Sequence, residues 1–78
     1  MTWKTRIVAD PAVLAGKPIV KGTRLSVDFI LSLLAEGWSE SQVLENYPQL
    51  KQEDLNAVFG FVQACMAEEE FVALGKLA

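Results

Sequence analysis

Five of the seven basic side chains lie in the first 25 residues, a clustering that favours contact with phosphate groups. These candidate nucleic-acid-binding residues are Lys4, Arg6, Lys17, Lys21 and Arg24. With Asp10 as the only acid among them, residues 1–25 carry a formal charge of +4, whereas residues 26–78 combine two cations with nine acids, a charge of −7. Because cations dominate the affinity for a nucleic-acid backbone, phosphate contact is expected at the N-terminal end. The alternative is that the oppositely charged ends attract each other within a dimer.

Three of these cations surround a Gly-Thr pair in the stretch KPIVKGTRL, residues 17–25. Lys17 and Lys21 are expected to be exposed and to attract phosphate. Arg24 has two open interpretations. It either joins them, or it forms a bidentate pair with a carboxylate such as Asp10 and ties the N-terminal elements together.

Two amide side chains, Asn56 and Gln63, are seven residues apart on the exposed face of an expected helix, where they can pair with adenine edges in a DNA groove. The alternative is that they are ordinary surface amides, which is what most exposed Asn and Gln side chains are. The helix that carries them, over about residues 52–67, contains no Lys or Arg. An acidic recognition helix repels phosphate, so the N-terminal cations must supply most of any DNA affinity.

The composition argues against an enzyme and against a metal centre. The chain has no His and only Cys65, which leaves neither a histidine base nor a set of zinc ligands. Cys65 is interpreted as a small buried hydrophobe on the core face of its helix. No cofactor is expected.

The periodicity of apolar residues predicts a mainly α single domain over residues 1–78. Residues 1–25 form a β-ribbon, with a strand over TWKTRIV and a hairpin at Gly22-Thr23. Residues 26–67 form three helices, at about 27–36 behind the cap Ser26, from the S-x-x-Q capping box at Ser39 to about 46, and at about 52–67. The last two helices form a helix-turn-helix unit. Residues 68–78 form a C-terminal tail.

Apolar side chains beyond the needs of one small core predict contacts with other chains. Phe29 and Leu33 form a second stripe on the first helix and are expected at a homodimer interface. In the tail, the candidate partner-binding residues are Phe71, Val72, Leu74 and Leu77. Residues 55–66 of the third helix are expected to bury one face, including Phe59 and Met66.

No apolar run is long enough for a membrane span, and the N-terminus lacks the apolar region of a secretory signal, so a cytoplasmic protein is expected.

Several short motifs occur in the order and spacing of a small prokaryotic family. They are Asp10-Pro11, Gly16-Lys17-Pro18, the stretch IVKGTR at residues 19–24, Val27, Gly37-Trp38-Ser39, Tyr47-Pro48-Gln49-Leu50 and Glu53-Asp54-Leu55. Through them, residues 7–67 resemble the domain-of-unknown-function 433 family, whose members are similar to homeodomain-like helix-turn-helix proteins and to the antitoxin half of toxin-antitoxin pairs. Lys51 departs from the family pattern, which tends to have a capping Thr there.

The resemblance implies a non-enzymatic homodimer that binds and neutralises a PIN-like ribonuclease toxin, with duplex operator DNA as a further partner. The alternative is a protein-interaction module on the same helix-turn-helix scaffold that does not bind DNA.

Overall fold

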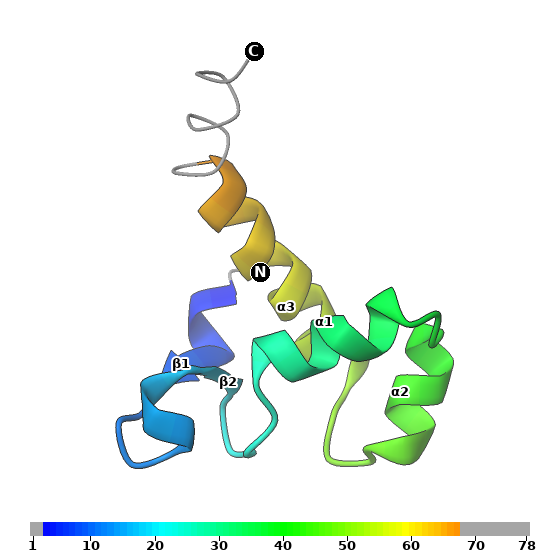
Figure 1. The fold of residues 1–78 in the computed structure, drawn as a ribbon, viewed down its shortest axis with the longest axis horizontal. Coiled ribbons are helices and arrows are strands. Elements are labelled where there is room, and N and C mark those ends of the chain that lie inside the picture. The colour runs from blue at the N-terminus through cyan, green and yellow to red at the C-terminus, as the bar shows by residue number, and fades with distance from the viewer. Residues whose placement is uncertain (1–2, 68–78) are drawn as a thin grey trace.

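The computed structural model describes residues 3–67 and shows a short two-stranded sheet followed by three helices (Figure 1). The order of elements is a 3₁₀ turn η1 (Trp3–Thr5), strand β1 (Ile7–Ala9), a second 3₁₀ turn η2 (Leu14–Gly16), strand β2 (Pro18–Val20), and helices α1 (Val27–Ala35), α2 (Glu40–Asn46) and α3 (Gln52–Cys65). The predicted fold class, a β-ribbon followed by a three-helix bundle, is confirmed. The candidate tail residues Phe71, Val72, Leu74 and Leu77 lie outside the described residues.

The ribbon pairs β1 with β2 in antiparallel register, Ile7 opposite Val20 and Ala9 opposite Pro18. Ile7 and Val20 point into the core, with 5% and 2% of their surface exposed. The predicted strand over residues 2–8 is wrong at its start, because residues 3–5 form a helical turn closed by the bond from Arg6 N to Trp3 O. Packing explains the difference, since this turn brings the Trp3 ring edge-on to Phe61 of α3, with the ring centroids 5.0 Å apart.

The Gly-Thr pair forms a tight turn after β2. Gly22 has φ +83°, a left-handed angle that favours glycine, and Thr23 Oγ1 donates to Val20 O at 2.8 Å while accepting from Leu25 N at 3.0 Å. The predicted hairpin here is reduced to this turn and one isolated bridge between Ile19 and Ser26. The chain therefore pairs β2 with β1, and runs from the turn directly into α1.

Helix α1 begins as predicted, because Ser26 Oγ accepts from Phe29 N at 2.9 Å. Its core-facing side chains are Val27, Ile30 and Leu33. The interpretation of Leu33 as part of an exposed stripe is wrong, since only 8% of its surface is exposed and it packs within the core of its own chain. Positions 27, 30 and 33 form one helical stripe, so the core uses Leu33 and leaves Phe29 outside, 38% exposed and edge-on to Tyr47.

Helices α2 and α3 differ in how their N-terminal ends are capped. In α2 the predicted capping box is complete, with Ser39 Oγ accepting from Gln42 N and Gln42 Oε1 accepting from Ser39 N. Helix α3 follows Lys51, whose side chain has no oxygen to accept a bond. Only the reciprocal half of a box is present there, because Asp54 Oδ2 accepts from Lys51 N at 2.9 Å.

The core joins the ribbon, all three helices and the loop before α3. Its most buried large side chains are Ile30, Leu55, Val20, Val43 and Val58. The buried core residues fall between Ile7 and Val58, and Phe61 and Val62 pack against them only partly buried, so the last turn of α3 extends beyond the packed body (Figure 1). The expectation that residues 55–66 bury one continuous face is therefore wrong in its second half: Cys65 is exposed, and Phe59 and Met66 are 43% and 47% exposed.

No helix among residues 3–67 combines the length and apolar character that a membrane crossing requires.

Candidate nucleic-acid and partner interfaces

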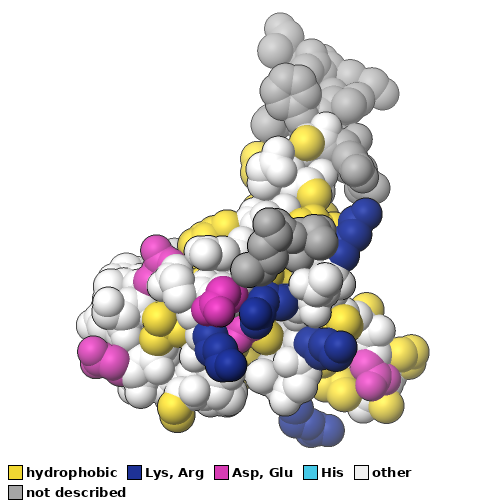
Figure 2. Space-filling model, turned by 180° about the vertical axis from the view of Figure 1, so that it is seen from behind, with side chains coloured by type: hydrophobic (Ala, Val, Ile, Leu, Met, Phe, Trp, Pro, Cys, Tyr) yellow, Lys and Arg dark blue, Asp and Glu magenta, His cyan; other side chains and the backbone are white. Residues whose placement is uncertain are grey.

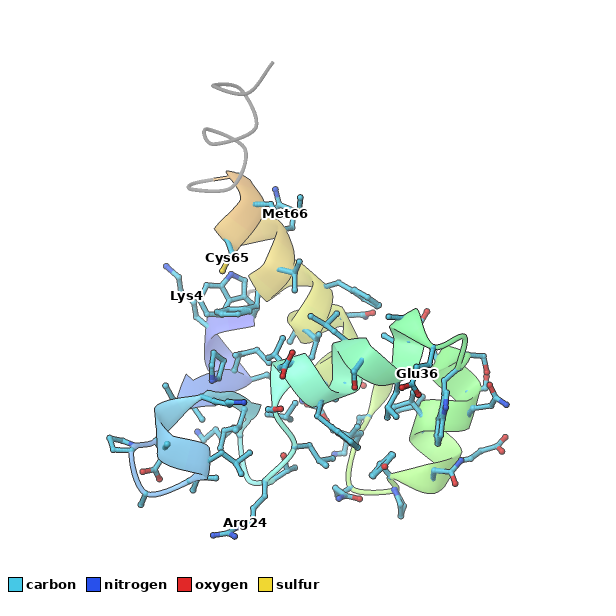
Figure 3. All side chains as sticks on the ribbon, in the orientation of Figure 1. Lys4, Arg24, Glu36, Cys65 and Met66 are labelled. Carbon is cyan, nitrogen blue, oxygen red and sulfur yellow. The ribbon has the colours of Figure 1, made fainter. Side chains whose placement is uncertain are left out.

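Three of the predicted cations, Lys17, Lys21 and Arg24, are exposed on the N-terminal module, defined as residues 3–25. Lys17 follows η2, while Lys21 and Arg24 flank the Gly-Thr turn, and Figure 3 shows Arg24 extending away from the body of the protein. Within residues 3–67, no carboxylate lies within ion-pair distance of these three side chains. Their charges are therefore available to an anionic partner.

The alternative role of Arg24, an ion pair with Asp10, is not found in the described part of the chain. Asp10 Oδ1 instead accepts a hydrogen bond from Ala12 N at 2.9 Å and so shapes its own loop. Of the two interpretations, the structure retains the one in which Arg24 is an exposed cation.

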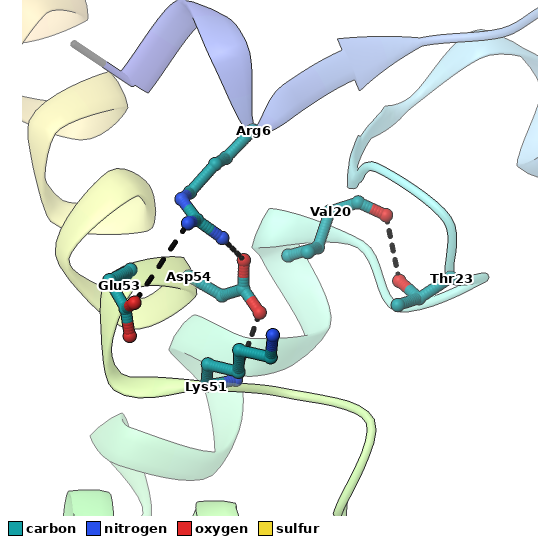
Figure 4. Close-up of polar contacts among 6 residues, drawn as sticks. All are labelled: Arg6, Val20, Thr23, Lys51, Glu53 and Asp54. Carbon is teal, nitrogen blue, oxygen red and sulfur yellow. Dashed lines mark hydrogen bonds and ion pairs between the residues drawn. The ribbon is translucent and has the colours of Figure 1, made fainter. Parts of the chain in front are cut away.

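Arg6 has the structural role that was one of the two interpretations of Arg24. Its Nη1 donates to Asp54 Oδ1 at 2.9 Å, and its Nη2 lies 4.0 Å from Glu53 Oε2 (Figure 4). Asp54 is buried, and its second oxygen accepts from Lys51 N. One carboxylate thus joins the residue before β1 to the first turn of α3, and the Arg6 guanidinium is largely engaged within the fold.

Lys4 is exposed and holds its Nζ 6.0 Å from the centroid of the Trp3 ring, at the limit of a cation–π contact. Figure 2 shows several Lys and Arg side chains on a single face, with acidic side chains beside some of them. The basic character of the module is therefore local, and strongest where Lys17, Lys21 and Arg24 are exposed.

The two candidate amides lie in different surroundings. Asn56 Oδ1 accepts from Gln52 Nε2 at 3.2 Å, and the same Gln52 nitrogen donates to Glu40 Oε1 at 2.8 Å. Gln63 is exposed beside Phe59, Val62 and Met66, which line a shallow apolar hollow. Asn56 is thus part of a polar network with an acid, and the structure does not bring the two amides together with a cation.

Two hollows flank the second half of α3. One lies between α3 and α1 and is lined chiefly by Leu31, Phe61, Val62, Cys65 and Met66. The other is the hollow beside Gln63, which adjoins the first because Val62 and Met66 line both. From Leu55 to Ala67 the sequence has no charged residue, so this half of α3 is a neutral, apolar surface on a chain that is otherwise rich in charge.

An open groove of about 540 Å³ lies between η2, the Gly-Thr turn and the first turns of α1. Its lining combines the apolar Leu14, Leu25 and Phe29 with the cations Lys17 and Arg24. Phe29, a candidate dimer residue, thus lines a surface groove. Leu14 carried no signal in the sequence, because its exposure depends on a left-handed backbone that Leu rarely adopts.

Within residues 3–67, no three His, Cys, Asp or Glu side chains are grouped so as to hold a metal ion. The carboxylates that lie closest to a cation, those of Asp54 and Glu53, serve the ion pairs with Arg6. The arrangement is that of a binding surface made of exposed cations and apolar side chains.

Comparison with known proteins finds relatives without an assigned activity. The chain is 31% identical over 58 residues to an uncharacterized protein, y4eO, of Sinorhizobium fredii (strain NBRC 101917 / NGR234). That match covers 74% of this chain and 26% of y4eO, so the chain spans about a quarter of the length of this curated relative. No solved structure matches the chain at a significant level. Residues 7–62 match the family described as protein of unknown function (DUF433), and because this is most of the chain, the protein belongs to that family.

Proposed function

We propose that this chain is a cytoplasmic, non-enzymatic, antitoxin-like protein of a type II toxin-antitoxin pair, which binds and neutralises a PIN-like ribonuclease and binds operator DNA as a dimer. The observation that carries the proposal is the separation of two surfaces. Lys17, Lys21 and Arg24 are exposed on the N-terminal module, whereas the second half of α3 is neutral and exposes Phe59 and Met66.

The second half of α3 supports a role in protein binding. A neutral helical surface with exposed Phe and Met side chains is typical of a surface that another protein covers. The sequence after it carries Glu68, Glu69 and Glu70. A ribonuclease needs a positive cleft to hold RNA, so a chain that presents apolar side chains followed by three acids complements such a cleft.

Any DNA binding depends on the N-terminal module. The exposed residues in the first turns of α3 include Glu53, and Asn56 is hydrogen-bonded to Gln52. A recognition helix that presents a carboxylate to the phosphate backbone is unfavourable. DNA contact through Lys17, Lys21 and Arg24 avoids this repulsion, because the three cations lie on the turns around the ribbon.

The second candidate function is a protein-interaction module that does not bind DNA. It is favoured by the same acidic start of α3, and by the engagement of Arg6 with Asp54, which takes one cation from the predicted set. The two functions share the partner surface and differ only in the use of the exposed cations.

The partner can be identified by affinity capture of the tagged chain from lysate of its native cells, treated with nuclease to remove nucleic-acid bridges. Recovery of a PIN-like ribonuclease at near-equal amount, followed by loss of its RNA cleavage when the purified chain is added, is expected. A truncated chain, residues 1–67, retains every core residue and is expected to bind the ribonuclease more weakly. A recovered ribonuclease that stays fully active in the presence of the chain contradicts the proposal.

DNA binding is tested by titrating duplex operator DNA at several salt concentrations. Each phosphate contact contributes about −0.9 to the slope of log affinity against log salt, so Lys21→Ala is expected to flatten the slope by about one contact. Lys51→Ala, which removes an exposed cation at the start of α3, is the control and is expected to leave the slope unchanged. The absence of measurable DNA binding, or equal effects of the two substitutions on the salt slope, favours the module that does not bind DNA.

A further inference from the structure

The groove between η2, the Gly-Thr turn and α1 is assembled from three segments of chain. Leu14 comes from η2, Lys17 is the residue after η2, Arg24 and Leu25 come from the turn, and Phe29 comes from the first turn of α1. We call it the Leu14–Phe29 groove. Leu14 is 44% exposed and Phe29 is 38% exposed, so two of the large apolar side chains that the described chain leaves in water lie on the same groove. Covering them removes apolar surface from water and is favourable.

The backbone holds Leu14 in this exposed position at a cost. Leu14 and Ala15 have φ values of +50° and +56°, which side chains other than glycine rarely adopt. The loop keeps these angles through bonds from Val13 N to Asp10 O and from Lys17 N to Leu14 O. A strained backbone that places an apolar side chain in solvent is the kind of feature that a binding surface explains.

The charge of the groove points to an acidic occupant. Lys17 and Arg24 line it together with a single acid, Asp28, which leaves an excess of positive charge. An extended peptide that carries carboxylates next to apolar side chains therefore complements both properties of the groove. Residues 68–78, with the sequence EEEFVALGKLA, have this composition, because Glu68 to Glu70 come directly before Phe71 and Val72.

The position of α3 makes a second copy of the chain the source of that segment. Glu68 to Glu70 follow Cys65, the last residue of α3, by three to five residues, so at about 3.3–3.6 Å per residue they stay within about 10–18 Å of the end of α3 in their own chain. Figure 3 places Cys65 and Met66 at one end of the molecule and Arg24 at the other. Lys17 lies between them, since it lines both the groove and the hollow beside Cys65. Within one chain, Lys17 is therefore the nearer of the two cations to the glutamates, whereas the segment of a second copy can approach Lys17 and Arg24 together.

We propose that the Leu14–Phe29 groove binds residues 68–74 of a second copy, so that two chains exchange their acidic C-terminal segments in a symmetric dimer. The glutamates pair with Lys17 and Arg24, and Phe71 and Val72 cover Leu14 and Phe29. The exchange does not require the nuclease partner. A nuclease that takes up the same segment is expected to convert the dimer into a complex with one copy of the chain per nuclease.

The test uses charge reversal on each side of the contact and sedimentation velocity of the full-length chain. The groove variant carries Lys17→Glu and Arg24→Glu, and the tail variant carries Glu68→Lys, Glu69→Lys and Glu70→Lys. Alone, each variant places like charges together at both contacts and is expected to dimerise at least about tenfold more weakly than the wild-type chain, because four or more pairs are reversed. Circular dichroism and thermal melting check that each variant is folded.

Mixing the two variants separates exchange between chains from contact within a chain. In the mixture, the acidic groove of one variant meets the basic tail of the other, and the basic groove meets the acidic tail, so dimers are expected to return. A tail that binds its own groove gives no such recovery. The matched control for Arg24→Glu is Lys21→Glu, which makes an equal charge change three residues away on the same turn. Lys21 is outside the groove lining, so Lys21→Glu is expected to leave dimerisation unchanged.

Three results overturn the proposal. They are a wild-type chain that stays monomeric at its highest soluble concentration, reversal variants that remain as dimeric as the wild type, and a mixture of the two variants that stays monomeric. A monomeric wild-type chain would also contradict DNA binding as a dimer, but none of these results bears on neutralisation of a nuclease, so the failure of this proposal is distinguishable from the failure of that function.

Discussion

Arg6 and Asp54 are 48 residues apart in the sequence and are joined by a hydrogen-bonded ion pair, with Nη1 2.9 Å from Oδ1. Asp54 is buried, and its other oxygen accepts the backbone N–H of Lys51 (Figure 4). A single side chain therefore anchors the residue before the ribbon to α3 and satisfies an N–H group at the start of that helix. Loss of this carboxylate is expected to loosen both ends of the fold together.

Asp54→Asn is expected to lower the free energy of unfolding by about 1–3 kcal/mol, because it removes the charge from a buried group that accepts two hydrogen bonds. Denaturation by urea, with the midpoint and slope compared with those of the wild type, measures the change. Glu53→Gln is the matched control, since Glu53 lies 4.0 Å from Arg6 and its side chain is 48% exposed. Its effect is expected to stay below about 0.5 kcal/mol. Equal losses for the two substitutions would contradict the anchoring role of Asp54.

Lys51→Thr is expected to raise the free energy of unfolding by about 0.5–1 kcal/mol. The substitution supplies an oxygen that can accept from the N–H of Asp54, while Asp54 Oδ2 continues to accept from the N–H of residue 51, so the half-formed capping box is completed. Lys51→Ala, which removes the lysine without supplying an acceptor, isolates the effect of the new oxygen. A melting temperature that rises equally for both variants would show that loss of the lysine, and not capping, stabilises the chain.

The helices were predictable because their signals are local. Ser26 and Ser39 each precede an apolar periodic stretch and each accepts the expected backbone N–H, and Tyr47-Pro48 ends α2 by a restriction on the residue before proline. The turn at Trp3 was not predictable by the same means. Its alternating residues are typical of a strand, and only the packing of Trp3 on Phe61, far along the chain, makes a helical turn the better solution.

The candidate site was likewise predictable from the sequence only in part. Exposure of Lys17, Lys21 and Arg24 follows from their charge and from the turn residues between them. The engagement of Arg6 does not, because it depends on Asp54 being carried into the core beside Leu55. Cys65 was misassigned for a related reason. A helical apolar stripe shows which face is apolar, but not how far along the helix the rest of the chain covers that face.

Gly60→Ala is expected to stabilise the chain by about 0.5–1 kcal/mol, since glycine in a helix interior costs about this much relative to alanine. A Cβ at this position would lie 3.5 Å from Cβ and Cδ1 of Trp3, an ordinary van der Waals separation, so the η1 turn need not move. Thermal melting measures the change in stability, and Trp fluorescence reports any shift of the Trp3 ring. Gly37→Ala is the contrasting variant, because Gly37 has φ +105° and alanine there is expected to destabilise. Loss of stability at Gly60 would mean that Trp3 has no room to accommodate a methyl group.

Ala15→Gly tests whether the loop beside the Leu14–Phe29 groove is strained in the folded chain. Alanine at φ +56° costs the folded chain about 1–2 kcal/mol, a strain that glycine relieves. Glycine also gives the unfolded chain more conformational freedom, which lowers stability by about 0.5–1 kcal/mol. The expected net effect is a rise in the free energy of unfolding of about 0.5–1 kcal/mol. Ala12→Gly, at an exposed residue of the same loop without a positive φ, is expected to destabilise by about 0.4–1 kcal/mol. Urea denaturation of the two variants at one protein concentration makes the comparison. If both substitutions destabilise equally, the loop is unstrained, and the exposure of Leu14 has no energetic cost for a bound segment to offset.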